Sequence, residues 1–391
     1  MSRGAEFAGG AAGREQVPFF SQANTFERLW PEISARVDDV FDNGKFSHGK
    51  QVGELERALA GYTGARHVVG VNSGTDALVL LLRGLGIRPG DEVVVPAYSF
   101  IATATAVVLA GGEPVFADID PVSYALDPAE IDRVAGPRTR FVLPAHLFCQ
   151  MADMSAIDAV ANDRGLTVVE DSAEGIGMRQ RGFHAGLHGA GGVLSFFPSK
   201  TLGALGDAGA VLTDDARVAE AVAALRHHGR FSNTLDNFPG IATETGAAGT
   251  NSKMDDIQAA VLLAKLEHLD EEIVRRAELA ERYRQGLDGL VRLPQAPDPE
   301  SAVFYVYLIE VDDRDGLVDF LARRGIGTET YYPVPLHLQP CFAGRGHRWG
   351  AFPRAEAASE RAVALPLYPD LEPEQVDRVC AAVREFVTGR V

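Results

Sequence analysis

The segment of residues 192–213, GVLSFFPSKTLGALGDAGAVLT, places one lysine between two apolar, strand-like stretches. Lys200 stands in a turn rich in serine and glycine, where a chain usually reverses sharply between buried strands. Lysine is normally a solvated surface residue, so a lysine at this place needs a reason. One hypothesis is a pair with a nearby anion, and the other is a chemical role for the amine itself.

Around this segment, residues 65–215 alternate short apolar runs with helical patterns. Strands are predicted at HVVGV (67–71), DEVVVP (91–96), EPVFADI (113–119), TRFVLPAH (139–146), LTVVED (166–171), GAGGVLSFF (189–197) and GAVLT (209–213). Helices are predicted at TDALVLLLRGLG (75–86), ATATAVVLAGG (102–112) and DMSAIDAVANDRG (153–165). This alternation predicts an α/β fold with a mainly parallel sheet covered by helices.

The second half of the chain has a different organisation. A polar stretch rich in Gly, Asn and Thr (227–253) predicts a long irregular excursion, and residues 255–287 predict one long helical segment. After a proline-rich stretch a smaller unit begins, with a predicted strand at 304–311 and helices at 315–326 and 373–387. The predicted domains are a flexible N-terminal tail (1–20), a large cofactor-binding domain (21–270) and a small C-terminal domain (271–391).

Composition excludes several classes of function. The chain has 391 residues, 46% of them hydrophobic, and a formal net charge of −17, which disfavours a general nucleic-acid or anionic-membrane binder. Cys149, Cys341 and Cys380 are widely separated, which argues against a disulfide framework or a structural metal site and favours a reducing cytoplasm. The Gly/Ala-rich N-terminus lacks the apolar run of a signal peptide.

Candidate site residues follow the predicted strands, because ligands of open parallel sheets bind beyond the carboxyl ends of the strands. The first predicted strand is followed by NSGTDAL (72–78), where Gly74, Thr75 and Asp76 begin a helix whose free N–H groups can hold a phosphate. The alternative is a simple helix cap. The second strand is followed by AYSF, in which Tyr98 or Phe100 can stack on a planar ring or belong to the core.

Two further strands end in charged side chains. Glu170 and Asp171 end the strand at 166–171, and since strand residues alternate faces, only one of them is expected to point into the site. Taken alone, Asp171 fits a helix cap or a structural ion pair better. Partial desolvation of Lys200 predicts a lowered pKa and a nucleophilic amine, against the alternative of a lysine paired to the phosphate or to a carboxylate. Ser195 precedes it in the same segment.

Together these residues fit a single ligand, pyridoxal 5′-phosphate (PLP). A phosphate cup, a ring-stacking aromatic, a carboxylate for the ring nitrogen and a lysine for an imine occur in this order along the chain. Each motif is weak alone, and their joint occurrence at strand ends predicts a PLP enzyme.

The chain from about residue 40 onward resembles the DegT/DnrJ/EryC1/StrS aminotransferases. The resemblance rests on NSGTDAL, RPGDEVVVPAYSFIATATAV, GGEPVFADIDP, VED, SFFPSKTLGALGDAGAVLT, NSKMDDIQAAVL, YYPVPLHLQPCF and ALPLYP. It implies a fold-type I, aspartate aminotransferase-like PLP-dependent transferase with a seven-stranded sheet and a small α+β domain. It also implies amination of a keto group on a dTDP-, UDP- or GDP-activated deoxysugar, with L-glutamate as donor, by a cytoplasmic homodimer with shared active sites.

The resemblance also assigns residues. Lys200 matches the Schiff-base lysine and Asp171 the carboxylate at the ring nitrogen. The remaining cofactor positions are Gly74, Thr75 and Ser195 for the phosphate, Phe100 for ring stacking, and Asn251, which reaches the phosphate in the neighbouring subunit's site. Apart from the resemblance, candidates for the sugar or its pyrophosphate are Arg230, His228, Tyr331, Tyr332 and His337. A surface or interface role fits each of them at least as well.

Two positions depart from the family pattern. Glu174 stands near the cofactor where relatives often have Gln or His, and Cys149 stands where many have Gly, as a small buried residue. Alternative functions are amination of a cyclitol ketone or related precursor and a non-catalytic regulatory role. A nucleotide-binding oxidoreductase is disfavoured because no G-x-G-x-x-G follows the first strand.

Overall fold

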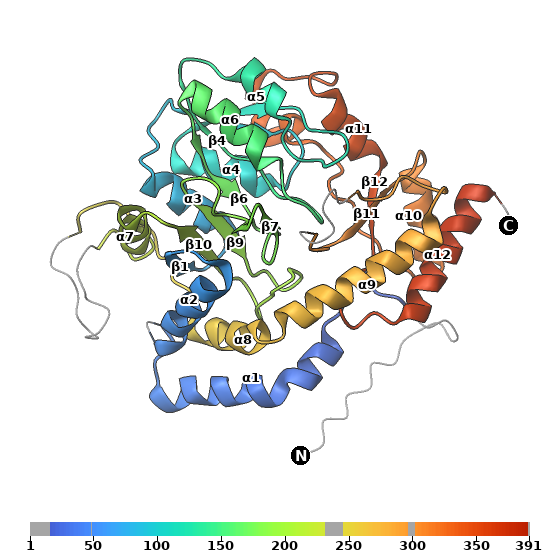
Figure 1. Ribbon diagram of the computed structural model, residues 1–391, viewed down its shortest axis with the longest axis horizontal. Coiled ribbons are helices and arrows are strands. Elements are labelled where there is room, and N and C mark those ends of the chain that lie inside the picture. Colours follow the sequence, from blue (N-terminus) through green and yellow to red (C-terminus); the bar gives the residue numbers. More distant parts are fainter. Residues whose placement is uncertain (1–15, 48, 231–244, 296–301, 390–391) are drawn as a thin grey trace.

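The computed structural model describes residues 16–389 apart from 48, 231–244 and 296–301. Its larger part, on the left in Figure 1, is built around one sheet, made of two four-stranded pieces that β5 (Thr167–Val168) and β6 (Glu170–Asp171) join. The strands lie in the order β1 (His67–Val71), β10 (Gly209–Thr213), β9 (Gly192–Ser195), β5 and β6, β4 (Thr139–Val142), β2 (Glu92–Pro96) and β3 (Glu113–Ala117). The predicted fold class is therefore confirmed.

β5 and β6 are two halves of one strand that joins the two sides of the sheet. The N–H of Val169, between them, donates to Val142, and Asp171 forms a parallel bridge with Ala145. Only β10 runs antiparallel to both of its neighbours. It follows β9 through the segment 196–208 with no crossover helix, and a direct connection between adjacent strands makes them antiparallel. The sequence predicted the strand but not its direction.

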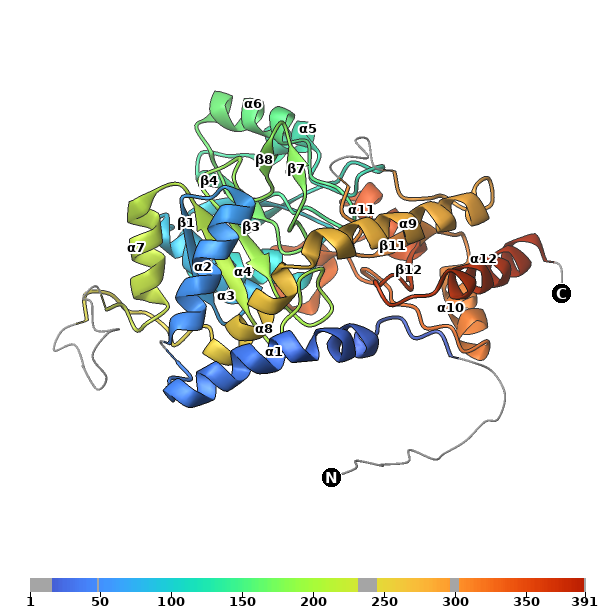
Figure 2. The same ribbon diagram turned by 60° about the horizontal axis from the view of Figure 1, so that its bottom comes forward.

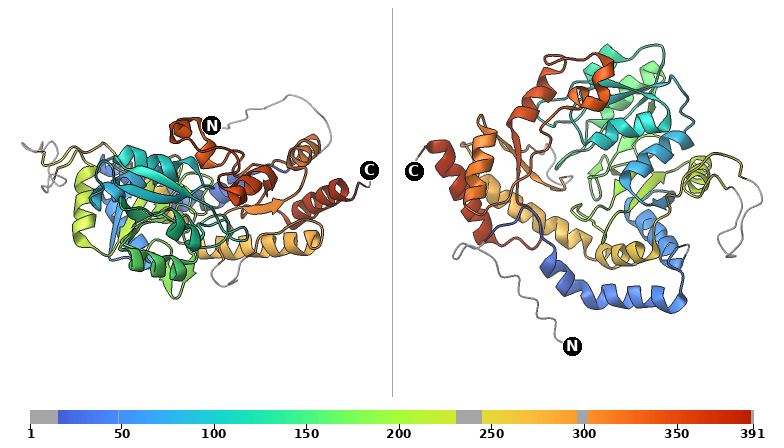
Figure 3. Two further views of the ribbon diagram at one scale, coloured as in Figure 1. Left: turned by 90° about the horizontal axis from the view of Figure 1, so that it is seen from above. Right: turned by 180° about the vertical axis from the view of Figure 1, so that it is seen from behind.

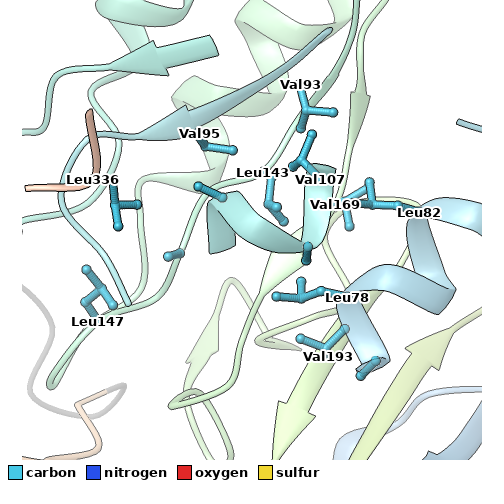
Figure 4. Packing of buried hydrophobic residues seen from close by; sticks show 14 of the residues in the cluster. Leu78, Leu82, Val93, Val95, Val107, Leu143, Leu147, Val169, Val193 and Leu336 are labelled. Carbon is cyan, nitrogen blue, oxygen red and sulfur yellow. The ribbon is translucent and has the colours of Figure 1, made fainter. Parts of the chain in front are cut away.

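Helices cover both faces of the sheet. One face carries α3 (Gly74–Gly84), α4 (Ile101–Ala110) and α7 (Ala216–Leu225), and the other carries α2 (Lys50–Thr63), α5 (Pro128–Val134), α6 (Met154–Arg164) and α8 (Asp256–Leu266). In β2, Val93 and Val95 join the first core and Val94 the other, as strand alternation requires. Figure 4 shows the first core, where each fully buried valine contributes about 1.5–3 kcal/mol.

A long helix before the sheet, α1 (Ala23–Asn43), lies along α8 (Figure 2). Leu29 and Ile33 pack on Val261 and Ala264 in a small core of their own. The sequence reasoning assigned no element before residue 65, and so missed both α1 and α2. Their apolar stripes are narrow, and they depend on α8, more than 200 residues later, for burial.

The C-terminal unit is built on α9 (Leu269–Leu287), which runs to it from the sheet (Figures 1 and 3). Its other elements are β11 (Tyr307–Glu310), α10 (Arg314–Arg323), η1 (Leu336–Leu338), η2 (Pro340–Arg345), α11 (Pro353–Arg361), β12 (Ala362–Leu365) and α12 (Pro373–Thr388). β11 and β12 are antiparallel, and their side chains share a core with α9, α10 and α12.

Two expectations need correction. The single helical segment predicted over 255–287 is two helices, α8 and α9, interrupted at Glu267 and His268. The tail predicted over 1–20 does not extend to Val17, which is fully buried and whose N–H donates to Gly325 at 2.9 Å; residues 1–15 lie outside the described part. The domain limits at 270/271 remain a prediction, and α9 contributes to the cores on both sides of that boundary.

In the described ranges, no helix is long and apolar enough to cross a membrane. The same part of the chain holds no group of three or more His, Cys, Asp or Glu side chains arranged for a metal ion.

His184 sits in the hairpin of β7 (Arg179–Gln180) and β8 (Phe183–His184), fully buried. Its Nε2 accepts the N–H of Gly177 at 2.9 Å, and its Nδ1 lies 2.6 Å from the carbonyl of Ala185. This arrangement suits the neutral ring with hydrogen on Nδ1. Desolvation by burial lowers the pKa of His184 to about 4.

A pH dependence of stability follows. Since the pKa of His184 lies below its unfolded value, its contribution is complete above pH 6.5 and is lost as the pH falls toward 4. Between pH 7 and 5 this amounts to about 2 kcal/mol. In urea unfolding, the free energy of unfolding should fall between pH 7 and pH 5 by about 2 kcal/mol less for His184→Gln than for the native protein. His67→Gln, at a half-buried position, should show the same fall as the native protein. Equal losses in all three proteins would contradict the assignment.

Candidate active site

A cavity of about 430 Å³ opens at the carboxyl ends of the parallel strands. Segments that follow β1, β2, β4, β6 and β9 line it, together with three tyrosines from later in the chain. Of the predicted residues, the structure brings together Gly74, Thr75, Phe100, Asp171, Glu174, Ser195, Lys200, Tyr331 and Tyr332. A cavity of this size suits a small ligand or cofactor.

The start of α3 forms one wall. Ser73 caps the helix by accepting the N–H of Asp76 at 3.1 Å, while Gly74 and Thr75 occupy the first turn, where N–H groups have no partner within the helix. A Cβ on Gly74 would lie 2.8 Å from the Cβ of Ser195. Glycine therefore allows α3 to approach β9 closely enough for Thr75 and Ser195 to line one cradle, which suits an anion at a helix N-terminus.

Asp171 and Glu170 point to opposite sides, as strand alternation predicts. Asp171 lines the cavity, and its carboxylate accepts the hydroxyl of Thr103 at 2.7 Å. Glu170 is fully buried away from the cavity and accepts three backbone N–H groups and His146. Burial acts to raise the pKa of Glu170, but His146 and these donors lower it overall. The hydrogen bonds of Glu170 thus fix the end of the strand on one face, and Asp171 points into the cavity on the other face.

Lys200 enters the cavity from the turn after β9. Its Nζ lies 3.0 Å from Oε1 of Glu174 and 4.1 Å from the ring centre of Tyr305. The sequence predicted a lowered pKa, and this expectation is wrong. Desolvation is the largest single influence and acts to lower the pKa of Lys200, but Glu174, Tyr305 and Asp171 together outweigh it, and the pKa is raised.

The turn that carries Lys200 is held from α8. Gln258 accepts the N–H of Leu205 at 2.9 Å, and the buried Lys265 donates to the carbonyl of Gly203 at 2.7 Å. A Cβ on Gly203 would lie only 2.3 Å from the carbonyl oxygen of Pro198, so the turn closes on itself only with glycine there. These contacts fix the backbone on the carboxyl side of Lys200.

Aromatic side chains form the opposite wall. Phe100 is half exposed at the cavity and lies 6.1 Å from Tyr332, centre to centre. Tyr98, the alternative ring-stacking candidate, is fully buried and donates its hydroxyl to the carbonyl of Tyr331. Tyr98 therefore belongs to the core, and Phe100 is the aromatic available to a ligand.

Other predicted residues lie elsewhere. Asn251 is exposed outside this cavity, and its backbone bridges His227. Arg230 contacts His227 at 3.3 Å, also outside it. His337 is buried with Nε2 3.0 Å from Glu356, so a substrate in the cavity does not reach it in this arrangement. Their roles remain predictions, and most of the excursion expected over 227–253 lies outside the described residues.

Cys149, the other departure from the family pattern, is buried, and burial raises its pKa to about 12. This supports a packing role. Sequence reasoning missed six polar residues at the cavity or against Asp171: Ser99, Thr103, His146, Ser199, Asp207 and Tyr305. Tyr305 stood inside an apparently ordinary strand sequence, so no local signal marked it. His146, in contrast, is the last residue of a predicted strand and could have been found by the rule that located Asp171.

These side chains fit PLP. A cradle of helix N–H groups and Ser195 suits the phosphate, Asp171 suits the ring nitrogen, and Lys200 supplies the amine, all within one cavity.

Comparison with known proteins gives concordant findings. A model of the DegT/DnrJ/EryC1/StrS aminotransferase family matches residues 28–384. The dTDP-3-amino-3,4,6-trideoxy-alpha-D-glucose transaminase of Streptomyces venezuelae is 41% identical, over 95% of this chain and 96% of its own. A pleiotropic regulatory protein of Geobacillus stearothermophilus is 40% identical, over 95% and 98%. The crystal structure of S. venezuelae DesV in complex with a ketimine intermediate superposes with a TM-score of 0.90, at 41% identity, covering 96% of this chain and 99% of that one.

The close approach at Gly74 can be tested. Gly74→Ala should push α3 from β9 and weaken PLP binding at least about tenfold, because a Cβ contact of 2.8 Å to a rigid neighbour must be relieved. Gly61→Ala is the matched control, since Gly61 lies within α2 with nothing near its Cβ position; it should raise the free energy of unfolding by about 1 kcal/mol and leave binding unchanged. Absorbance titration measures the affinity for PLP, and urea unfolding measures the free energy of unfolding. Equal PLP affinities for both variants would exclude the proposed cradle.

Proposed function

The chain belongs to the DegT/DnrJ/EryC1/StrS aminotransferase family, and we propose that its acceptor is a keto group of a nucleotide-activated deoxysugar, aminated at the expense of L-glutamate. It is a PLP-dependent aminotransferase. The observation that carries the proposal is the meeting of Asp171, Lys200 and the Gly74–Ser195 cradle in one cavity. The name of the S. venezuelae relative, a dTDP-aminosugar transaminase, supports the substrate class.

In this proposal each cavity residue has a place. Gly74, Thr75 and Ser195 would hold the phosphate, Phe100 would lie on the ring, and Asp171, fixed by Thr103, would keep a proton on the ring nitrogen. When bound, PLP accepts the amino group and withdraws electrons from the adjacent carbon. Lys200 would hold the cofactor and carry the proton that moves during transfer at its Nζ. Glu174 is also proposed to contact the cofactor in this cavity.

Substrate contacts are proposed on the aromatic side. Tyr331 and Tyr332 line the cavity and would face the sugar. Arg230 and His337 lie outside it in this chain, so they would act only through a rearrangement or from a second copy.

A homodimer with shared active sites is part of the proposal. Asn251 is exposed outside its own cavity, and Phe100 is half exposed at the mouth, which suits a second copy covering this face. A cytoplasmic location is supported by three free cysteines, of which Cys149 and Cys380 are buried.

The cofactor assignment is tested by colour and reduction. Purified protein should be yellow, and borohydride should bleach it and leave the cofactor mass on the peptide that contains Lys200. Lys200→Ala should bind PLP without a reducible bond and lose turnover, whereas Lys45→Ala, at an exposed lysine, should behave as native. Full activity of Lys200→Ala would refute the assignment.

The substrate class is tested by half-reactions. With L-glutamate alone, the protein should release about one equivalent of 2-oxoglutarate per site, and turnover should continue only when a dTDP-, UDP- or GDP-linked keto-deoxysugar is added. Mass spectrometry of the sugar product reads the result. Turnover with a cyclitol ketone only would overturn the sugar proposal. Failure of every donor and acceptor would favour the regulatory alternative.

A further inference from the structure

The amine of Lys200 contacts two groups that both favour its charged form. Oε1 of Glu174 is 3.0 Å away, and the Tyr305 ring centre is 4.1 Å away. Glu174 and Tyr305 are each 4% exposed, so water competes little with either contact. An ion pair and a cation–π contact are both stronger when desolvated.

Both partners are tied to the backbone of one residue, Phe148. The N–H of Phe148 donates to Oε2 of Glu174 at 2.8 Å, and the carbonyl of Phe148 accepts the N–H of Tyr305 at 2.8 Å. Phe148 has a φ of +64°, in the left-handed region that is unfavourable for a bulky residue. This conformation persists because the surrounding contacts fix it, and strained residues of this kind cluster at functional sites.

Tyr305 is held further along its length. Its hydroxyl lies 3.2 Å from the hydroxyl of Ser199, the residue before Lys200, and 3.4 Å from that of Tyr331. Its carbonyl accepts from the buried Arg276 at 3.1 Å. The ring is therefore fixed from the Lys200 turn, from the aromatic wall and from α9, and it does not move freely away from Nζ.

The other titratable groups around Lys200 do not replace this pair. Asp171 forms no hydrogen bond or ion pair with the amine and has a smaller effect on it than Glu174, and its carboxylate already accepts from Thr103. The remaining titratable side chains that line the cavity are His146, Asp207, Tyr331 and Tyr332. No contact with Nζ is found for any of these four.

We propose that Glu174 and Tyr305 form a clamp that keeps the Nζ of Lys200 protonated and in one position whenever that nitrogen carries no covalent bond to the cofactor. This rests on the proposed function of the cavity. For Lys200 to act as a base, its Nζ–H bond must break and an Oε1–H bond form on Glu174, which converts the ion pair into a neutral amine and a neutral acid. Glu174 is thus the nearest acceptor for the proton of Lys200, and it is a catalytic residue in this proposal.

The test measures the charge of Lys200 directly. The full chain loaded with pyridoxamine 5′-phosphate, which leaves Lys200 free, is labelled with trace acetic anhydride from pH 6 to 10. Acetylation of Lys200 is quantified by mass spectrometry against exposed Lys45, because only neutral amines react. Glu174→Gln keeps an oxygen for the N–H of Phe148 but removes the charge. It should speed acetylation at pH 7.5 at least about tenfold, a downward shift of one pKa unit.

Two variants of Tyr305 distinguish the effect of its ring on Lys200 from the effect of its hydroxyl. Tyr305→Leu removes the ring and should speed acetylation about two- to fivefold, in line with a cation–π contact. Tyr305→Phe keeps the ring and should stay within about twofold of native. Glu267→Gln, at a surface ion pair with Arg36, is the matched control and should leave the profile unchanged.

An unchanged profile in folded Glu174→Gln, checked by circular dichroism, would overturn the proposal. So would a Tyr305→Phe profile equal to that of Tyr305→Leu, since the hydroxyl would then be the active part. The same labelling in the chain without added cofactor needs neither PLP chemistry nor a sugar. A shifted profile there with no aminotransferase activity would refute the proposed function alone, and an active enzyme with an unshifted profile would refute the clamp alone.

Discussion

A lysine amine directed into a cavity and largely removed from water needs compensating contacts, and much of the site follows from that constraint. Desolvation acts to lower the pKa of Lys200 and so favours its neutral form. The structure instead supplies a carboxylate at 3.0 Å and an aromatic face at 4.1 Å. Both are fixed through the backbone of Phe148, so the segment after β4 determines the charge of a residue that follows β9.

The antiparallel direction of β10 also determines the kind of turn that carries Lys200. A crossover helix after β9 would have placed a helix N-terminus there, as happens at Gly74 after β1. The antiparallel return leaves a glycine-rich turn instead, and α8 holds it through Gln258 and Lys265. The sheet edge therefore offers helix N–H groups to an anion after β1 and an amine after β9, two strands along the sheet. This is the charge distribution that a phosphorylated aldehyde requires.

Sequence periodicity predicted the positions of all seven strands and the opposite orientations of Glu170 and Asp171, because alternation is a local property. It failed where the outcome depends on distant contacts. The break between α8 and α9 carries no Gly or Pro to mark it. The pKa of Lys200 is set by Glu174 and by Tyr305, 26 and 105 positions away in the sequence. Residues that meet only through the tertiary fold leave no local pattern to interpret.

Glu174 illustrates what a single departure from a family pattern means physically. A glutamine in its place would keep an oxygen for the N–H of Phe148, so the loop geometry does not require the acid. What the glutamate adds is a negative charge shared by its two oxygens, of which Oε1 contacts Lys200 and Oε2 accepts the N–H of Phe148. The difference between Glu and Gln here concerns the proton on Nζ. It follows that this position tunes the reactivity of Lys200 without altering the shape of the cavity that the substrate meets.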